Sequence, residues 1–385
     1  MSERYDVVVV GAGIHGAGVA QAAAAAGYTV LVLEQTAVAA GTSSRSSKLI
    51  HGGLRYLESG RLRLVRESLR ERELLLRLAP TLVRRTAFHI PVYKHSTRSA
   101  LTIRAGLSLY ALLGGLSRET RFARVPAAEW GGLDGLSTEG LKAVYRYHDA
   151  QTDDAELTRA VMRSAVGLGA RLECPATFVA ATVSAREVAT DYTVAGAARQ
   201  CVARVLVNAA GPWVNTVLAA LRPAPRPLSI ELVQGAHIVV GGHLTHGAYY
   251  VEAHDRRPVF VLPHGARTLV GTTETRHIGP PETTAPQPEE IAYLQQTLTR
   301  YFPGADAHVL AAFAGVRVLP HANGAYAKRA RETALYVDPA LARVLSIYGG
   351  KLTGYRATAE KAMHRLNSLL PGRTPRAKTA RLMLS

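Results

Sequence analysis

The sequence predicts an α/β fold in which a second, mostly antiparallel sheet is inserted into the first domain. Residues 5–10 form an apolar β-branched run that leads through a glycine-rich turn into an alanine-rich helix, and residues 344–367 repeat this order near the end of the chain. Between them, residues 226–275 change to short alternating strands, which are typical of an antiparallel sheet. The late return to a β–α pattern places this sheet inside the first domain.

The composition is that of a globular protein with a strong positive charge. The chain has 385 residues, 48% apolar and 19% charged, and its length suggests two or three domains. Its 46 Lys and Arg against 29 Asp and Glu give a formal charge of +17. This excess favours anionic partners: phosphorylated metabolites, acidic lipid surfaces or nucleic acid. The alternative is that the charge lies on solvated helix faces.

Cysteine usage and the N-terminus indicate a reducing, cytoplasmic location. Only Cys174 and Cys201 occur, without a CxxC spacing or a Cys/His cluster, so neither a disulfide framework nor a metal site is expected. The chain enters a strand too early to carry a signal peptide. Residues 100–116 come nearest to a membrane span, and they predict either a helix lying on a bilayer or a buried helix.

The first β–α unit is followed by a strand, a charged helix and a second strand. Residues 27–34 form a strand that ends at Glu34, and a right-handed crossover makes it parallel to the first. Residues 61–79 predict an amphipathic helix with its apolar residues near one face. Residues 88–93 predict a short strand at a sheet edge, because Pro91 has no N–H to donate.

The remaining elements divide between the two predicted domains. Asp153 caps a predicted helix, with Glu156 completing a capping-box pattern, and a strand and a helix follow at 203–214 and 290–302. The basic residues 372–385 are expected to be loose. We therefore predict a cofactor-binding domain from residues 1–85, 146–225 and 308–385, and a substrate-binding domain from residues 86–145 and 226–307.

The first site is a dinucleotide-binding turn. Gly11, Gly13 and Gly16 form G-x-G-x-x-G directly after a strand and at the start of a helix. They permit a tight turn, close approach of the backbone to a pyrophosphate, and close helix packing, in that order. The helix N-terminus offers free N–H groups to the phosphates. Glu34 ends the second strand, where a carboxylate accepts from ribose hydroxyls and disfavours NADP.

Other features favour FAD over NAD as the dinucleotide. The fingerprint lies at the extreme N-terminus, and the hydroxyl-rich stretch "TSSRSSKLIHGGLRYL" of residues 42–57 follows soon after it. A second Gly-Gly strand–turn–helix, "YGGKLTGYR" at 348–356, could direct another helix dipole at a flavin ring. No second dinucleotide fold is present for a nicotinamide cofactor. The prediction is a Rossmann-like FAD-binding domain with non-covalently held FAD.

A series of motifs runs in order along nearly the whole chain: "DVVVVGAGIHGAGVA", "GTSSRSSKLIHGGLRYLE", "RLVRESLRERELLL", "LVNAAGPWV", "GAHIVV", "VGTTE", "AGVRVLP" and "GGKLTGYR". Together they resemble the FAD-dependent glycerol-3-phosphate dehydrogenases, which belong to the D-amino-acid-oxidase-like flavoproteins. The resemblance implies that the Ser/Thr-rich half of residues 42–57 holds FAD and that the "HGGLRYL" half reaches the substrate. The expected FAD contacts are Gly11, Gly13, Ile14, His15, Gly16, Glu34, Gln35, Thr42, Ser43, Ser44, Ser47, Lys48, Leu49, His51, Gly52, Gly53, Gly211, Trp213, Gly350, Lys351, Leu352 and Thr353.

The resemblance also implies a set of substrate-site residues. Those expected to bind substrate are Arg55, Tyr56, Thr272, Arg317, Arg331 and Lys351, and those expected to act in catalysis are His237, Arg55 and Arg317. Several cations from distant segments suit a phosphate monoester. For each arginine the alternative is a surface or ion-paired residue, and the local match at Arg331 is poorer. His237 is either the base or a core histidine, and Thr272 either contacts the site or ends a strand.

The implied chemistry is oxidation of sn-glycerol 3-phosphate to dihydroxyacetone phosphate, with hydride transfer to flavin N5. In the family a membrane quinone usually accepts the electrons, which implies an enzyme of glycerol metabolism that is cytoplasmic or peripheral on an anionic membrane surface. A homodimer is a further expectation. Family members usually continue into a helical C-terminal domain, which this chain is expected to lack because it ends at Ser385. Gly354 stands where the family commonly has threonine, which implies a looser flavin contact.

Three other functions compete with this prediction. A flavoenzyme of the same fold could act on another small anion, such as a 2-hydroxy acid or an amino acid. An inactive flavin-binding paralogue would keep the fold without the chemistry. A nucleic-acid-binding protein is not expected, because the charges are dispersed, aromatic residues make up only 6% of the chain and no reading motif occurs.

Overall fold

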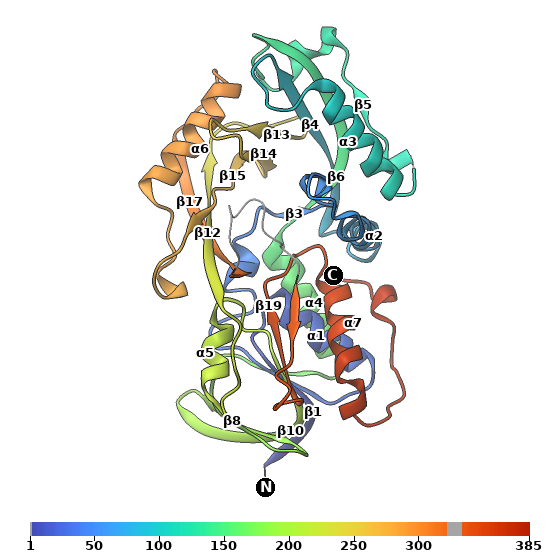
Figure 1. Cartoon of the computed structure of the whole chain (residues 1–385), viewed down its shortest axis with the longest axis vertical. Helices are drawn as coiled ribbons and strands as arrows, with labels where there is room; N and C mark the ends of the chain where they lie inside the picture. Colours follow the sequence, from blue (N-terminus) through green and yellow to red (C-terminus); the bar gives the residue numbers. More distant parts are fainter. Residues whose placement is uncertain (1, 117, 322–332) are drawn as a thin grey trace.

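The computed structural model of the chain describes residues 2–116, 118–321 and 333–385. Two sheets hold the strands of the described residues, and Figure 1 shows one below the other, with the N-terminus at the bottom and the C-terminus near mid-height. Within these residues, no helix combines the length and the apolar character that a membrane crossing requires.

The first sheet has a parallel centre. Its middle strand β1 (Glu3–Val10) lies between β2 (Val30–Leu33) and β10 (Ala197–Asn208), and β7 (Arg171–Glu173) and β19 (Val344–Tyr348) extend it in parallel. The four valines at 7–10 are buried, as expected of a strand covered on both faces. Strands β8 (Ala176–Val183), β9 (Val188–Val194) and β18 (Ala334–Tyr336) add antiparallel pairs to the sheet, and the short β11 (Leu221–Arg222) pairs in parallel with β8.

Three helices pack in one layer against this sheet. Helix α1 (Ile14–Ala25) lies between α4 (Asp154–Gly167) and α7 (Tyr355–Leu366), in the lower part of Figure 1. Because both sides of α1 are covered, nearly all its residues are buried, and its alanines allow the close approach. The cap predicted for α4 is present, since the Asp153 side chain accepts a hydrogen bond from the backbone N–H of Glu156 at 3.0 Å. The short α5 (Val214–Ala219) packs against the other face.

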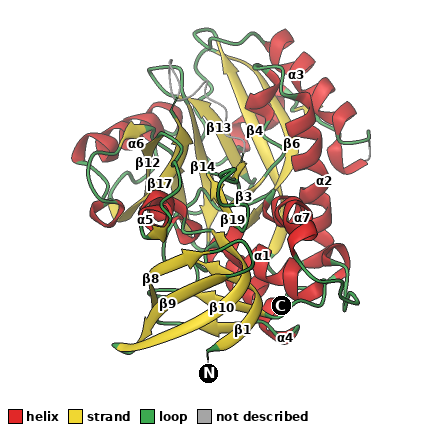
Figure 2. Ribbon diagram, turned by 60° about the horizontal axis from the view of Figure 1, so that its bottom comes forward, coloured by secondary structure: helices red, strands yellow, loops and turns green. Residues whose placement is uncertain are grey.

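The second sheet is mostly antiparallel. Its path runs β16 (Thr275–Arg276), β12 (Ile230–Val240), β15 (Arg267–Gly271), β14 (Pro258–His264), β13 (Ala248–Glu252), β4 (Val83–Tyr93), β6 (Leu141–Thr152) and β3 (Leu49–Ile50), with β17 (Val309–Pro320) on β12 and β5 (Ala123–Arg124) on β6. Helix α6 (Pro288–Tyr301) covers one face, and α2 (Leu62–Leu78) and α3 (Ala100–Leu113) cover part of the other. Figure 2 shows these two sets of helices on opposite sides. Short 3-10 helices lie at Thr42–Ser44 (η1), Leu54–Leu57 (η2), Arg118–Thr120, Ala127–Gly132, Gly211–Trp213, Pro281–Thr283, Asn367–Leu369 and Thr379–Arg381.

The predicted edge position of residues 88–93 is wrong, because β4 lies between β13 and β6. The structure tolerates Pro91 since β13 pairs with β4 only at Phe88 and His89. On that side, β4 has no partner strand at the proline among the described residues, so no ladder donor is lost there.

The division of the chain into two domains stays a prediction, and the structure shows only which strands share a sheet. Residues 309–320 form β17 in the second sheet, although the predicted boundary at 308 grouped them with the first. The segment at 49–50 also pairs into the second sheet. The chain therefore crosses between the sheets at more points than the composition change near residue 226 suggested.

The basic segment 372–385 is docked rather than loose, contrary to the expectation from its composition. The backbone N–H groups of Arg376 and Ala377 donate to the Ala25 carbonyl at the end of α1, at 2.7 and 3.1 Å. Leu384 is 3% exposed and its N–H donates to the Leu78 carbonyl at 2.7 Å. These backbone contacts and one buried leucine hold the segment in place.

Candidate functional site

A cavity of about 730 Å³ lies where the two sheets meet, a size usual for a ligand site. Five groups of residues form most of its wall: 10–15, 33–36, 40–56, 209–217 and 315–319. The turn at 349–353 and the aromatic residues Phe88, Tyr147 and Phe260 also line it.

The glycine turn before α1 forms one end of the cavity. Gly11 has φ +99°, and a Cβ there would lie 2.8 Å from the Ala209 carbonyl oxygen. At Gly16 a Cβ would lie 1.9 Å from the Gly11 carbonyl oxygen, so only glycine lets the helix pack against its own turn. Gly11 and Gly13 line the cavity, whereas Gly16 lies behind the turn.

His15 lies at the start of α1 and lines the same end. Neither of its ring nitrogens has a hydrogen-bond partner within the described part of the chain. Burial lowers the pKa of His15 to about 4, so the ring is neutral near neutral pH. The ring lies close to the 349–350 turn, because a Cβ at Gly350 would lie 1.9 Å from His15 Nε2. These buried polar atoms and the glycine cradle suit a phosphorylated ligand with hydrogen-bonding groups.

Glu34 lies at the end of β2, as predicted, and lines the cavity. Its Oε2 accepts from the Ala12 N–H at 2.8 Å, and its Oε1 accepts from the N–H and hydroxyl of Thr36 at 2.9 and 3.1 Å. These bonds orient a carboxylate beside the glycine turn, where a ribose hydroxyl would donate to it.

The hydroxyl-rich segment contributes only some of its predicted contacts. Of the predicted cofactor residues in and around it, Thr42, Ser43, Ser47, Leu49, His51 and Gly53 line the cavity, and Ser44, Lys48 and Gly52 do not. Ser43 Oγ accepts from the Ile14 N–H at 2.9 Å and so lies at the start of α1. Lys48 instead forms an ion pair with the buried Asp154 at the start of α4.

Of the predicted cofactor residues outside that segment, all but Gly16 line the cavity. Besides Gly11, Gly13, His15 and Glu34, described above, they are Ile14, Gln35, Gly211, Trp213, Gly350, Lys351, Leu352 and Thr353. The aromatic Trp213 donates its indole N–H to Glu282, another residue of the cavity wall.

Cations from three distant segments meet in the cavity. Arg55, Arg317 and Lys351 all line it, together with Tyr56 and Thr272. The Lys351 ammonium lies 3.7 Å from the centroid of the Tyr56 ring. Burial lowers the pKa of Arg317 to about 10, which still leaves the guanidinium charged at neutral pH. The predicted residue Arg331 lies outside the described residues.

Glu274 lies between two of these cations, and sequence reasoning missed it. Its Oε1 is 3.5 Å from Arg317 Nη1 and 3.8 Å from Arg55 Nη2. Arg317 also donates to the Thr272 hydroxyl at 3.2 Å. The available signal for Glu274 was its place at the end of "VGTTE", directly after a strand.

Other cavity residues were also missed, and three of them lie within strands. Asp149 and Tyr147 on β6 and Phe88 on β4 line the wall, and so does Arg257, whose guanidinium donates to the Glu274 carbonyl at 2.8 Å. The two-residue spacing of Tyr147 and Asp149 indicates a shared face of the strand. Only the tertiary fold shows which face the cavity lies on.

His237 does not line the cavity. It is 1% exposed on β12, with its ring stacked on Phe313 and its Nε2 2.9 Å from the Ser47 hydroxyl. Ser47 does line the cavity, so His237 lies one residue behind the wall. Burial, with the charges of Arg317 and Lys48, lowers the pKa of His237 to about 3 and keeps the ring neutral.

Comparison with known proteins gives consistent matches. The profile of the family "FAD dependent oxidoreductase" matches residues 6–355. The chain is 40% identical to a glycerol-3-phosphate dehydrogenase of Pseudomonas aeruginosa, over 95% of this chain and 72% of the relative. It is 38% identical to a D-erythritol 1-phosphate dehydrogenase of Brucella abortus, over 96% of this chain and 75% of the relative. Among solved structures, the glycerol-3-phosphate dehydrogenase of Bacillus halodurans complexed with FAD matches with a TM-score of 0.76 and 26% identity, over 99% of this chain and 68% of that one.

Proposed function

Because the chain belongs to the FAD-dependent oxidoreductases, and within them to the glycerol-3-phosphate dehydrogenase family, we propose that it oxidises sn-glycerol 3-phosphate to dihydroxyacetone phosphate. Its cofactor is FAD. The observation that carries the substrate assignment is the meeting of Arg55, Arg317 and Lys351 in one cavity with the glycine turn. A group of several cations suits a phosphate dianion better than it suits a neutral alcohol.

The residues of the cavity fit FAD. The start of α1 offers backbone N–H groups to a pyrophosphate, and Glu34 presents a carboxylate to a ribose. The ring nitrogens of His15, which have no partner among the described residues, are available to a ligand at the same end. When bound, FAD supplies the acceptor for the hydride that leaves C2 of the alcohol.

The chain's own residues then have three tasks. Arg55, Arg317 and Lys351 bind the phosphate and so orient C2. The aromatic wall excludes water from the reacting carbon. The proton of the C2 hydroxyl needs an acceptor, and we propose neutral His237, reached through Ser47. A bound phosphate dianion would offset the positive charges that help to lower the pKa of His237.

The test of the proposed function is anaerobic titration of the purified flavoprotein. Glycerol 3-phosphate should bleach the visible flavin band, and glycerol, the matched compound without a phosphate, should not. A parallel titration with D-erythritol 1-phosphate compares the substrates named for two relatives of similar identity. Bleaching by a 2-hydroxy acid or an amino acid but by neither polyol phosphate would reject the proposal.

We further propose that a membrane quinone takes the electrons and that α3 lies on an anionic bilayer surface. The outer face of α3 exposes Leu101 by 75% and Leu112 by 58%, and Leu116, just beyond its end, is 57% exposed. Its inner face packs through Leu107 and Tyr110. An apolar face on a chain of charge +17 suits an interfacial helix.

The membrane proposal is tested by flotation with phosphatidylcholine vesicles, with and without phosphatidylglycerol. The double variant Leu101→Ser/Leu112→Ser should bind anionic vesicles more weakly than the unmodified chain. Ile278→Ser is the control, because Ile278 is 84% exposed but lies outside α3. Equal binding of all three proteins would reject a role for α3. A homodimer and a cytoplasmic location remain predictions from the resemblance.

A further inference from the structure

A buried polar cluster lies behind the loop 51–53, which joins β3 to η2. The N–H of Gly52 donates to the Tyr110 hydroxyl at 2.8 Å and lies 3.3 Å from Asp149 Oδ1. A Cβ at Gly52 would lie 2.4 Å from that hydroxyl and 2.5 Å from Leu69 Cδ2. The loop backbone is therefore pressed directly against the cluster.

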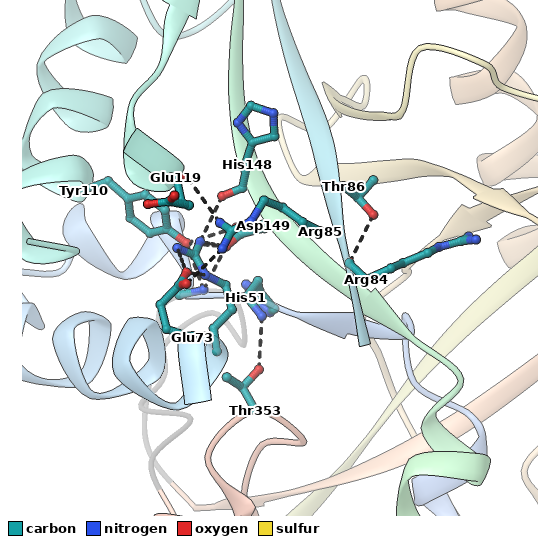
Figure 3. A network of polar contacts seen from close by, with 12 residues as sticks. His51, Glu73, Arg84, Arg85, Thr86, Tyr110, Glu119, His148, Asp149 and Thr353 are labelled. Carbon is teal, nitrogen blue, oxygen red and sulfur yellow. Dashed lines mark hydrogen bonds and ion pairs between the residues drawn. The ribbon is translucent and has the colours of Figure 1, made fainter. Parts of the chain in front are cut away.

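The cluster brings together side chains from three elements. Tyr110 comes from α3, Asp149 from β6 and Arg72 from α2, and they are 2%, 1% and 0% exposed. The Tyr110 hydroxyl lies 2.9 Å from both Asp149 carboxylate oxygens, and Arg72 donates to Asp149 at 2.5 Å and to the His148 carbonyl at 2.9 Å. Figure 3 shows Tyr110, Asp149 and His148 gathered beside His51.

The bonding roles within the cluster are well defined. Burial raises the pKa of Tyr110 well above its usual value, so the hydroxyl stays protonated. It can then donate to Asp149 while it accepts from Gly52. A buried ion pair such as Arg72–Asp149 adds little net stability compared with an apolar core, so a role in fixing geometry accounts for it better than stability does.

The loop is held from its other side as well, and it leads into cavity residues. The N–H of His51 donates to the Thr353 hydroxyl at 3.1 Å, a bond drawn in Figure 3. Gly53 has φ +78°, and a Cβ there would lie 2.3 Å from the Tyr56 ring. His51, Gly53, Arg55 and Tyr56 all line the cavity, so the position of Gly52 sets where these groups lie.

We propose that Tyr110, held by Asp149 and Arg72, is a positioning residue that fixes the loop 51–53 and, through it, the substrate contacts Arg55 and Tyr56. Tyr110 does not line the cavity and touches the loop through Gly52, while its other partner, Asp149, lines the cavity wall itself. The proposal rests on the proposed function for its kinetic consequence, but the loop geometry itself does not depend on which substrate binds.

The test is the variant Tyr110→Phe, which removes only the hydroxyl and keeps the ring packing of α3. Tyr93→Phe is the matched control, because Tyr93 is also buried, at 4% exposed, and its hydroxyl donates to the Ser137 carbonyl at 2.6 Å on the other face of the second sheet. Tyr93→Phe loses one buried hydroxyl bond, whereas Tyr110→Phe loses both its donation to Asp149 and its acceptance from the Gly52 N–H, and only Tyr110 touches the loop.

Two measurements on the FAD-loaded protein distinguish positioning from general stability. Amide hydrogen exchange at Gly52 should become faster in Tyr110→Phe and stay unchanged in Tyr93→Phe. The KM for glycerol 3-phosphate should rise by about fivefold in Tyr110→Phe, the effect of one weakened hydrogen bond, with a smaller change in kcat. Equal exchange and equal KM in the two variants would overturn the proposal.

Further arms keep the proposal falsifiable. If Tyr110→Phe does not fold, the unmodified protein still gives an answer, because its Gly52 amide should exchange slowly and fast exchange would overturn the inference. Asp149→Asn, which keeps the shape of the side chain but weakens its pair with Arg72, should also speed exchange at Gly52. Failure of glycerol 3-phosphate to bleach the flavin would reject the proposed function and leave the exchange result to stand alone.

Discussion

At the level of single residues, the cavity concentrates charges that lie far apart in the chain. Arg55, Arg317 and Glu274 come from three segments of the chain. Each of the two guanidinium groups lies within 4 Å of the Glu274 carboxylate. The carboxylate screens the two guanidinium groups from each other. A phosphate would meet both cations at this point, so each of them should contribute to substrate affinity.

We expect Arg317→Met to raise the KM for glycerol 3-phosphate by about 10- to 150-fold, the loss of one charge-assisted hydrogen bond of roughly 1.5–3 kcal/mol. Steady-state kinetics with saturating acceptor measure this. Arg186→Met is the control, since it removes the same charge from an exposed position in the turn between β8 and β9. A KM that is the same in both variants would contradict a phosphate-binding role for Arg317.

A second prediction at this scale concerns acid stability. Burial lowers the pKa of His89 to about 4 from a usual value of 6.5. Between these values the unfolded chain binds more protons than the folded one, so stability is lost as the pH falls. His89→Phe keeps a ring against Tyr249, which stacks on His89 with centroids 5.2 Å apart. The unfolding free energy of the His89→Phe variant should therefore fall by about 2 kcal/mol less than that of the unmodified protein when the pH is lowered to 5.

Urea unfolding of the FAD-loaded protein at a series of pH values measures this effect. The reference is the difference between the two proteins at about pH 8. There the His89 ring is neutral in both the folded and the unfolded state, so the difference reports only the change in packing. If the two proteins lost the same free energy on acidification, protonation of His89 would not contribute.

At the level of elements, the turn between β1 and α1 shows why the glycine pattern is informative. Gly11 and Gly16 are each required by a backbone contact that a side chain would block. The same turn places Ile14 and His15 at the cavity. Local spacing therefore predicted both the turn and its ligand-facing end.

Gly16→Ala should greatly reduce FAD retention, because the new Cβ would lie 1.9 Å from the Gly11 carbonyl oxygen and would displace the turn. The ratio of visible flavin absorption to protein absorption after purification measures it. Gly106→Ala is the control, since nothing lies within 4 Å of a Cβ built at this position of α3. Full flavin content in Gly16→Ala would show that the turn can adapt.

The elements also show where pattern reasoning fails. Pro91 suggested an edge strand, but β4 is an inner strand whose pairing with its neighbour β13 ends at His89, before the proline. Residues 372–385 suggested a loose end, but their backbone bonds to the ends of α1 and α2. In both cases the outcome depended on the length or position of a distant element, which a local pattern does not contain.

At the scale of the whole molecule, the charge of +17 should assist the arrival of a dianionic substrate. Raising the ionic strength from roughly 0.01 M to roughly 0.1 M shortens the screening length from about 30 Å to about 10 Å. We expect kcat/KM for glycerol 3-phosphate to fall several-fold over this range while kcat changes little. A kcat/KM that does not depend on salt would show that the positive charge is spread away from the cavity.

Sequence patterns alone determined the parallel β–α units, the antiparallel strands that follow and the glycine turn, because each is carried by a short run of residues with a defined spacing. The main cavity cations were indicated by the resemblance to a known family. Tertiary structure alone decided that Lys48 pairs with Asp154, that His237 lies behind Ser47, and that Glu274 and Asp149 belong to the cavity wall. The direction in which a side chain points, and what it meets there, depends on strand register and on packing between distant segments, and neither is encoded within one local stretch.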